Sequence, residues 1–325
     1  MSAPERLDAF MARANALYYA THDPFADFTT APEISQVVGE VLGAWAAVTW
    51  QAMGAPVPVI LAEAGPGRGT LMADALRLVR RTAPDFAASL RLHLVETSPR
   101  LRARAAAVLP DATWHRRIDD LPAGPLLLLA NEFLDALPIR QFVRRGTGWA
   151  ERFVAGESFV ECPATPDLPP AGEGTVRELC AAALALAGQL GARLARDGGA
   201  ALFLDYGPAE SGPGDSLQAV RDRHPAPPLA DPGGADLTAH VDFAAIAAAA
   251  RAAGAASWGP VPQGMFLARL GLHRRTGLLA RANPSRAASL IAAAQRLTEP
   301  HAMGRLFKAL AITHPALPEP AGFSE

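Results

Sequence analysis

The sequence predicts an α/β protein with a doubly wound, mostly parallel sheet, and three observations support this. Short apolar runs alternate with helical patterns along most of the chain. The run from Val57 to Leu61 leads into a glycine-rich turn, Gly65-Pro66-Gly67-Arg68-Gly69. Other runs end in polar residues, Glu96, Asn131 and Asp205. Because ligands of open α/β sheets bind beyond the carboxyl ends of the strands, these side chains mark one candidate site.

The composition is that of a globular enzyme. The chain has 325 residues, of which 50% are hydrophobic and 19% charged, and its net charge is −2. No basic surplus favours a nucleic-acid partner. The two cysteines, Cys162 and Cys180, lie in no metal-ligand or redox spacing, so we expect neither a metal site nor a disulfide.

No targeting or membrane segment is evident in the sequence. The N-terminal stretch lacks the apolar core of a signal peptide, and no stretch combines membrane length with freedom from charge. We therefore expect a cytoplasmic protein with no membrane partner.

The first 55 residues predict a helical lid or substrate segment. A helix is expected over residues 4–20, and the turn that follows carries two aromatic residues, Phe25 and Phe28, that should be covered. Thr30-Ala31-Pro32-Glu33 has the pattern of a capping box, which predicts a helix from there to Gly54.

The glycine turn fits a cofactor cradle. A dinucleotide fingerprint has the order Gly-x-Gly-x-x-Gly, so its third glycine lies three residues after the second. Here Gly65, Gly67 and Gly69 alternate, and Thr70 occupies the place of that third glycine. Glu63 adds a negative charge that would repel a pyrophosphate but suits a cation. S-adenosylmethionine carries a sulfonium and an ammonium, so the spacing and charge match the first motif of the class I methyltransferases. The alternative is a turn that merely connects strand to helix.

A further acid is spaced as a strand–helix–strand unit requires. Glu96 lies 31 residues after Gly65, at the end of a second predicted strand, and can reach a ribose bound over the first turn together with Thr97. An adenine contact is expected near Asp119. A solvated glutamate at a strand end is the alternative reading of Glu96.

The central strand of the sheet is predicted at residues 125–130, which are apolar on both faces. It ends in Asn131 and Glu132, which should point into the same crevice as Gly65 and Glu96.

The remaining chain predicts additions to a single domain of residues 1–325. We expect a hairpin over residues 140–160 and a helix over 175–196, which together form an insertion at 140–199. The cofactor-binding core would then be 56–139 and 200–325, with a proline- and glycine-rich loop at 208–235. A last strand pair is expected over 259–272, followed by a C-terminal helix with Met303, Leu306 and Leu310.

Several motifs together resemble one family, the MidA / NDUFAF7-like methyltransferases. They are Asp27-Phe28-Thr29-Thr30-Ala31-Pro32-Glu33-Ile34-Ser35-Gln36, the glycine turn, Asn131-Glu132-Phe133-Leu134-Asp135-Ala136-Leu137-Pro138, and Asp236-Leu237-Thr238-Ala239-His240-Val241-Asp242-Phe243. The resemblance implies a class I, Rossmann-like fold, S-adenosylmethionine as cofactor, and arginine methylation of a protein substrate. For the mitochondrial relative it implies a complex I subunit as target. The family usually has a longer loop before Asp27, so the lid is expected to close differently here.

The expected site follows from these motifs and from the chemistry of the reaction. A guanidinium is held well by carboxylates, and one of them must receive a proton. Glu132 is our first choice, with Asp135 or Glu33 as the second acid, although a capping role also explains Glu33. Expected cofactor contacts are Glu63, Gly65, Pro66, Gly67, Gly69, Thr70, Glu96, Thr97, Asp119, Asn131 and Glu132. Expected substrate contacts are Asp27, Phe28, Thr30, Pro32, Glu33 and His240.

Other functions remain as alternatives. A nucleic-acid amino-methyltransferase would normally follow Asn131 with prolines, which Glu132 and Phe133 replace. A nicotinamide oxidoreductase is less consistent with the turn. A non-catalytic assembly factor with a retained methyltransferase fold is the third alternative, and the intact set of cofactor residues favours retained chemistry over it. The oligomeric state is open, and a homodimer is one option.

Overall fold

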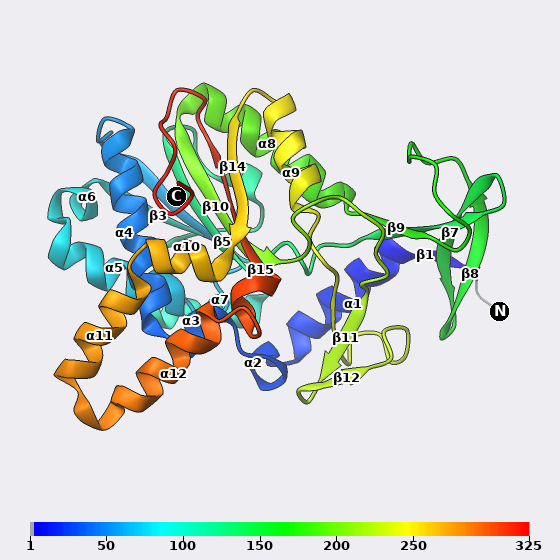
Figure 1. Cartoon of the computed structure of the whole chain (residues 1–325), viewed down its shortest axis with the longest axis horizontal. Coiled ribbons are helices and arrows are strands. Elements are labelled where there is room, and N and C mark those ends of the chain that lie inside the picture. The colour runs from blue at the N-terminus through cyan, green and yellow to red at the C-terminus, as the bar shows by residue number, and fades with distance from the viewer. Residues whose placement is uncertain (1–2, 325) are drawn as a thin grey trace.

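A central seven-stranded sheet organises the computed structural model, which describes residues 3–324 (Figure 1). In spatial order its strands are β14 (Ala256–Pro262), β15 (Phe307–Thr313), β10 (Gly199–Tyr206), β5 (Leu126–Asn131), β2 (Val59–Ala64), β3 (Leu90–Val95) and β4 (Thr113–His115). The five strands from β10 to β4 are parallel, and β15 and β14 add an antiparallel edge. The predicted doubly wound, mostly parallel sheet is confirmed.

Helices cover both faces of this sheet (Figure 1). On β5, Leu127 and Leu129 face one hydrophobic cluster, while Leu126 and Leu128 face another, as expected of a central strand. The first cluster is covered by α4 (Gln36–Ala52), α5 (Thr70–Thr82), α6 (Pro84–Ser89), α10 (Gln263–Arg269), α11 (Leu272–Ala282) and α12 (Ala287–Thr298). The second is covered by α8 (Ala181–Asp197) and α9 (Phe243–Ala252).

Two smaller antiparallel sheets lie beside the N-terminal helix α1 (Leu7–Thr21), away from the main body (Figure 1). One contains β1 (Glu5–Arg6), β6 (Arg140–Arg145), β7 (Gly148–Ala155), β8 (Ser158–Ala164) and β9 (Val176–Leu179). The other contains β11 (Gln218–Arg221), β12 (His224–Ala226) and β13 (Asp236–Thr238). The predicted hairpin at 140–160 is therefore part of a larger sheet, and the predicted loop at 208–235 contains two strands.

The predicted helix at 175–196 is wrong in its first turn. Residues Val176–Leu179 form β9, which pairs with β6, and α8 begins only at Ala181. Cys180 consequently lies at the N-cap of α8 and not within the helix. Pairing with a distant strand overrides the local helical pattern here.

The predicted C-terminal elements also differ from the structure. Residues 259–272 hold the end of β14 and then α10, so they form no strand pair. The helix α13 (Met303–Leu306) is a single turn, and Leu310 lies in β15, buried between β10 and β14.

The N-terminal segment bends where a continuous helix was predicted. α2 (Pro24–Asp27) and α3 (Ala31–Ile34) are single turns, and Ser35 is extended. The Ser35 hydroxyl accepts a hydrogen bond from the Val37 amide at 3.2 Å and so starts α4. The Thr30 side chain makes no capping bond, so the predicted capping box is wrong. This leaves the Glu33 carboxylate available to the site.

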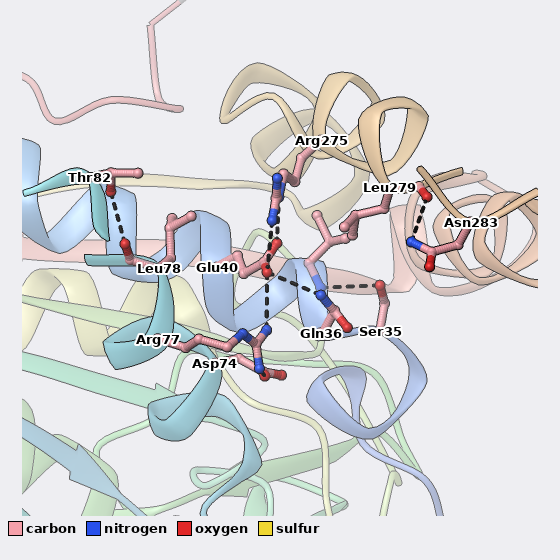
Figure 2. A network of polar contacts seen from close by, with 11 residues as sticks. Ser35, Gln36, Glu40, Asp74, Arg77, Leu78, Thr82, Arg275, Leu279 and Asn283 are labelled. Carbon is pink, nitrogen blue, oxygen red and sulfur yellow. Dashed lines mark hydrogen bonds and ion pairs between the residues drawn. The ribbon is translucent and has the colours of Figure 1, made fainter. Parts of the chain in front are cut away.

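One buried carboxylate joins the helices on the first face. Glu40 of α4, only 2% exposed, accepts hydrogen bonds from Arg275 of α11 at 2.7 and 3.1 Å and from Arg77 of α5 at 3.0 Å. Figure 2 shows Glu40 between the two arginines, with Asp74 also against Arg77. Burial opposes ionisation, but these arginine bonds outweigh it and hold the pKa of Glu40 below its ordinary value.

Candidate active site

A cavity of about 810 Å³ lies beyond the carboxyl ends of β2, β3 and β5. This is within the size range of small-molecule sites. The glycine turn between β2 and α5 forms part of its wall. The φ angles of Gly65, Gly67 and Gly69 are 66°, 54° and 80°, a left-handed backbone that favours glycine at these positions.

The expected cofactor residues converge on this cavity. Those that line it are Glu63, Gly65, Pro66, Gly67, Thr70, Glu96, Thr97, Asp119, Asn131 and Glu132. Gly69 does not line it. Gly69 is the N-cap of α5, and a Cβ there would approach Leu109 and Ala105 at 3.1 and 3.3 Å, so close packing explains this glycine.

Glu63 is the most deeply buried acid of the cavity wall, at 3% exposed. Burial raises its pKa to about 8, against a backbone hydrogen bond from Met72 that favours the charged form. Its Oε2 has no hydrogen-bond partner among the described residues, and the Oδ1 of Asn131 has none either. Buried acceptors are normally satisfied. Two orphaned acceptors on one cavity wall fit a ligand that brings N–H or O–H donors, as the ammonium and ribose hydroxyls of S-adenosylmethionine would.

Glu96 and Asp119 occupy different environments in the cavity. Glu96 Oε1 accepts a hydrogen bond from the Ser98 amide at 2.7 Å, and burial raises the pKa of Glu96. Asp119 lies exposed on the short helix η1 (Ile118–Asp120), paired with Arg117 at 3.0 Å.

Glu132 lies at the turn directly after β5. Its φ of 51° is left-handed, which is uncommon for a residue with a side chain. Its Oε1 accepts hydrogen bonds from the Ala31 amide at 2.8 Å and from the Asn131 side chain at 2.9 Å. Burial, opposed by these two bonds, raises its pKa to about 7. A carboxyl with this pKa can accept a proton at neutral pH.

The N-terminal segment closes over the glycine turn. Glu33 Oε1 accepts a hydrogen bond from the Thr70 hydroxyl at 2.5 Å, and Glu33 Oε2 lies 3.7 Å from Arg68. The guanidinium of Arg68 lies 4.3 Å from the centre of the Phe25 ring. The same ring is so close to Gly67 that an added Cβ would lie 2.7 Å from Phe25 Cζ. Phe25, expected to be covered, is therefore covered by the glycine turn itself.

Some of the expected substrate residues line the cavity and others do not. Those that do are Phe28, Thr30, Pro32 and Glu33. Asp27 is buried and accepts hydrogen bonds from the Tyr18 hydroxyl and, at 2.5 Å, from the Asp222 amide. His240 borders a separate small cavity and packs edge-on against Tyr206. Asp135, expected as an alternative second acid, is buried outside the cavity lining, where burial and the neighbouring carboxylates of Asp205 and Asp236 raise its pKa.

Two helices contribute lining residues that the sequence did not indicate. They are Ala12, Asn15, Ala16, Tyr19 and Ala20 of α1 and Ala182, Ala185, Leu186 and Gln189 of α8. Both stretches are alanine-rich and carry no motif. The Tyr19 hydroxyl donates to Asp236 at 2.7 Å, and the Ser98 hydroxyl donates to the Tyr19 carbonyl at 2.6 Å, so α1 is attached to the cavity from two sides.

The fold and this site define a class of protein. A glycine turn after the first parallel strand, acids after the first two strands and a carboxylate after the central strand are the arrangement of the class I methyltransferases. Because the orphaned acceptors suit a cationic ligand with hydroxyl groups, the site is consistent with S-adenosylmethionine and not with a pyrophosphate.

Comparisons with known proteins identify the family. A model of an S-adenosyl-L-methionine-dependent methyltransferase family matches residues 41–261. The mitochondrial protein arginine methyltransferase NDUFAF7 homolog of Drosophila melanogaster is 35% identical, over 95% of this chain and 80% of the relative. The human mitochondrial protein arginine methyltransferase NDUFAF7 is 34% identical, over 91% of this chain and 76% of the relative. A Burkholderia thailandensis structure bound to S-adenosyl-homocysteine is 27% identical, with a TM-score of 0.81, covering 98% of this chain and 90% of the other.

The chain belongs to this family of S-adenosylmethionine-dependent methyltransferases, which confirms the resemblance, the enzyme class and the cofactor. The cytoplasmic location is contradicted, because the curated relatives are named as mitochondrial proteins. Among residues 3–324, no helix is both long enough and apolar enough to cross a membrane.

Proposed function

We propose that the protein transfers a methyl group from S-adenosylmethionine to an arginine of a protein substrate. The relatives' names, protein arginine methyltransferase, support the choice of acceptor. The observation that carries it is the Glu132 carboxyl, which lines the cavity beside the glycine turn with a pKa raised to about 7.

Two carboxylates are suited to a guanidinium. Glu132 and Glu33 both line the cavity, and both are attached to the N-terminal segment or the turn, Glu132 through the Ala31 amide and Glu33 through the Thr70 hydroxyl. Paired carboxylates orient a planar guanidinium through its forked donors. We assign Glu132 and Glu33 this role, with Phe28, Thr30 and Pro32 as substrate contacts.

The proton balance assigns Glu132 a second task. The glycine turn, Glu63, Asn131 and Glu96 would hold S-adenosylmethionine, which would supply the methyl group by cleavage of its methyl–sulfur bond and leave as S-adenosyl-homocysteine. As the new C–N bond forms, the attacking guanidinium nitrogen loses one proton, and the product keeps its positive charge. Glu132 accepts this proton, which its raised pKa permits near neutral pH.

The resemblance to the MidA / NDUFAF7-like proteins extends the proposal to the target. We propose that the methylated protein is a subunit of the respiratory complex I type.

The test uses labelled S-adenosylmethionine and a protein extract from cells that lack this protein, with mass spectrometry for methylarginine. Wild type should label protein, and Glu132→Gln should lower the rate by at least about 100-fold, because a positioned base contributes 10²–10⁴. Affinity for S-adenosyl-homocysteine, measured by calorimetry, should stay within about threefold. Label found only on nucleic acid, or full activity of Glu132→Gln, would refute the proposal.

A further inference from the structure

Asp205 is a fully buried carboxylate with an unusual set of partners. It lies on β10, is 0% exposed, and has no ion pair within residues 3–324. Its Oδ2 accepts hydrogen bonds from the amides of Phe133, Leu134 and Asp135 at 3.0, 2.8 and 3.3 Å. Its Oδ1 accepts one from the Tyr206 amide at 2.9 Å. Four backbone donors thus take the place of a cation.

Three of these donors belong to the turn that carries the proposed catalytic carboxylate. The turn begins with Asn131 and Glu132, both of which line the cavity, and Glu132 has the left-handed φ of 51°. The Glu132 amide donates to the Leu204 carbonyl at 2.8 Å, one residue before Asp205. β10 therefore holds the turn at Glu132 and at the three residues that follow it. Residues in a strained backbone conformation that several surrounding bonds hold in place are common at functional sites.

We propose that Asp205 is a positioning residue for methyl transfer: it holds the 131–135 turn so that Asn131 and Glu132 point into the cavity. The effect on turnover rests on the proposed role of Glu132, whereas the effect on cofactor binding does not. Asp205 touches neither reactant, and it acts through the backbone of the turn.

The charge of Asp205 adds a second, separable effect. Burial is the main cause of the raised pKa of Glu132, and Asp205 raises it further, while Arg296 of α12 lowers it. The other ionisable groups near Asp205 are Asp135 of the turn and Tyr206, and Asp236 of β13 acts on Asp135. Loss of the Asp205 charge should therefore lower the pKa of Glu132 and move the acid limb of the pH–rate profile to lower pH.

An amide is a poor substitute for this carboxylate. Because both Asp205 oxygens accept from backbone amides, the NH2 group of Asp205→Asn would face at least one N–H donor. Asp205→Glu keeps the charge and both acceptors but displaces them by one methylene. The pair of variants separates the charge from the position.

The first experiment measures S-adenosyl-homocysteine affinity by calorimetry and needs no methyl acceptor. The variants are Asp205→Asn, Asn131→Ala and their combination, with Glu40→Gln as a matched loss of a buried carboxylate outside the cavity lining. We expect Asp205→Asn to weaken S-adenosyl-homocysteine binding about tenfold. The double variant should bind at most about twofold more weakly than the weaker of the two single variants. Glu40→Gln should bind as wild type does.

The second experiment measures single-turnover methyl transfer against pH. We expect Asp205→Asn to lose at least about 30-fold, because small misplacements of a catalytic group cost up to about 100-fold. Combining it with Glu132→Gln should add no further loss, and Asp205→Glu should be slow with an unshifted acid limb. If Asp205→Asn does not fold, Asp205→Glu replaces it in both experiments, alone and in the double variants.

The proposal is overturned if, in both experiments, the loss in the double variant equals the product of the losses in its two single variants. Wild-type affinity and rate in both Asp205 variants would also overturn it. Absence of methylarginine with the wild type would refute the proposed function alone. The affinity cycle would still decide the role of Asp205.

Discussion

Replacement of Glu63 by glutamine tests the electrostatics of the cofactor wall without any methyl acceptor. Burial raises the pKa of Glu63 from 4.5 to about 8. Since one pKa unit corresponds to about 1.4 kcal/mol, this difference in pKa changes the free energy of unfolding by about 5 kcal/mol between low and high pH. Glu63 is 3% exposed, so solvent screens little of this.

The sign follows from the raised pKa. Below about pH 4.5 the carboxyl is protonated in both the folded and the unfolded state, and its contribution is fully present. As the pH rises, the unfolded state loses its proton first, so the free energy of unfolding falls until the folded carboxyl ionises near pH 8. Glu63→Gln does not titrate and should lack this decline.

Urea unfolding without cofactor, at several values between about pH 5 and pH 9, measures the difference. Glu63→Gln should gain stability relative to wild type as the pH rises, by several kcal/mol at the upper end. If the free energy of unfolding changes with pH in the same way in both proteins, the raised pKa of the buried Glu63 carboxyl is refuted. S-adenosylmethionine should bind the ionised form of wild type, so calorimetry in two buffers near pH 7 should detect proton release that Glu63→Gln does not show.

Two further substitutions test the turn and the scaffold. Gly67→Val forces a side chain into a left-handed backbone and against Phe25, and should weaken S-adenosyl-homocysteine binding by at least about tenfold; unchanged affinity by calorimetry would contradict the cradle. Glu40→Gln breaks the bonds to Arg275 and Arg77 and should lower the free energy of unfolding by about 2–3 kcal/mol with cofactor affinity intact. Equal unfolding midpoints in urea would show that the network contributes little.

Local patterns were sufficient to predict the parallel core, and most of the expected cofactor residues line the cavity. The glycine turn, Glu96 and Asn131 were recognisable because each follows an apolar run, and parallel strands bring their carboxyl ends to one edge. The two alanine-rich lining helices gave no such signal. Tyr19 reaches the cavity through tertiary packing, with Asp236 and Ser98 as partners that lie far away in sequence.

Two segments predicted as helix form strands for one reason. Val176–Leu179 and Phe307–Thr313 became strands because β6, β10 and β14 supply partners that no local window contains. The capping box failed in a similar way: Thr70, 37 residues from Glu33, binds the carboxylate that Thr30 was expected to satisfy. The left-handed φ of Glu132 and its support by Asp205 were equally outside the reach of spacing, since both depend on the pairing of β5 with β10.

Four buried acids in or behind the cavity wall have a common electrostatic feature. Glu63, Glu132, Asp205 and Asp236 all have raised pKa values because burial penalises their charge, and none of them forms an ion pair among residues 3–324. Five acids with arginine partners have lowered pKa values instead: Asp8, Asp23, Glu40, Glu161 and Asp197. Glu63 and Glu132 line the cavity without an ion pair among the described residues, and the buried charge of these carboxylates lowers the stability of the protein. A cationic cofactor and a guanidinium acceptor would both offset that cost on binding, which links the local instability of the site to the charge of its ligands.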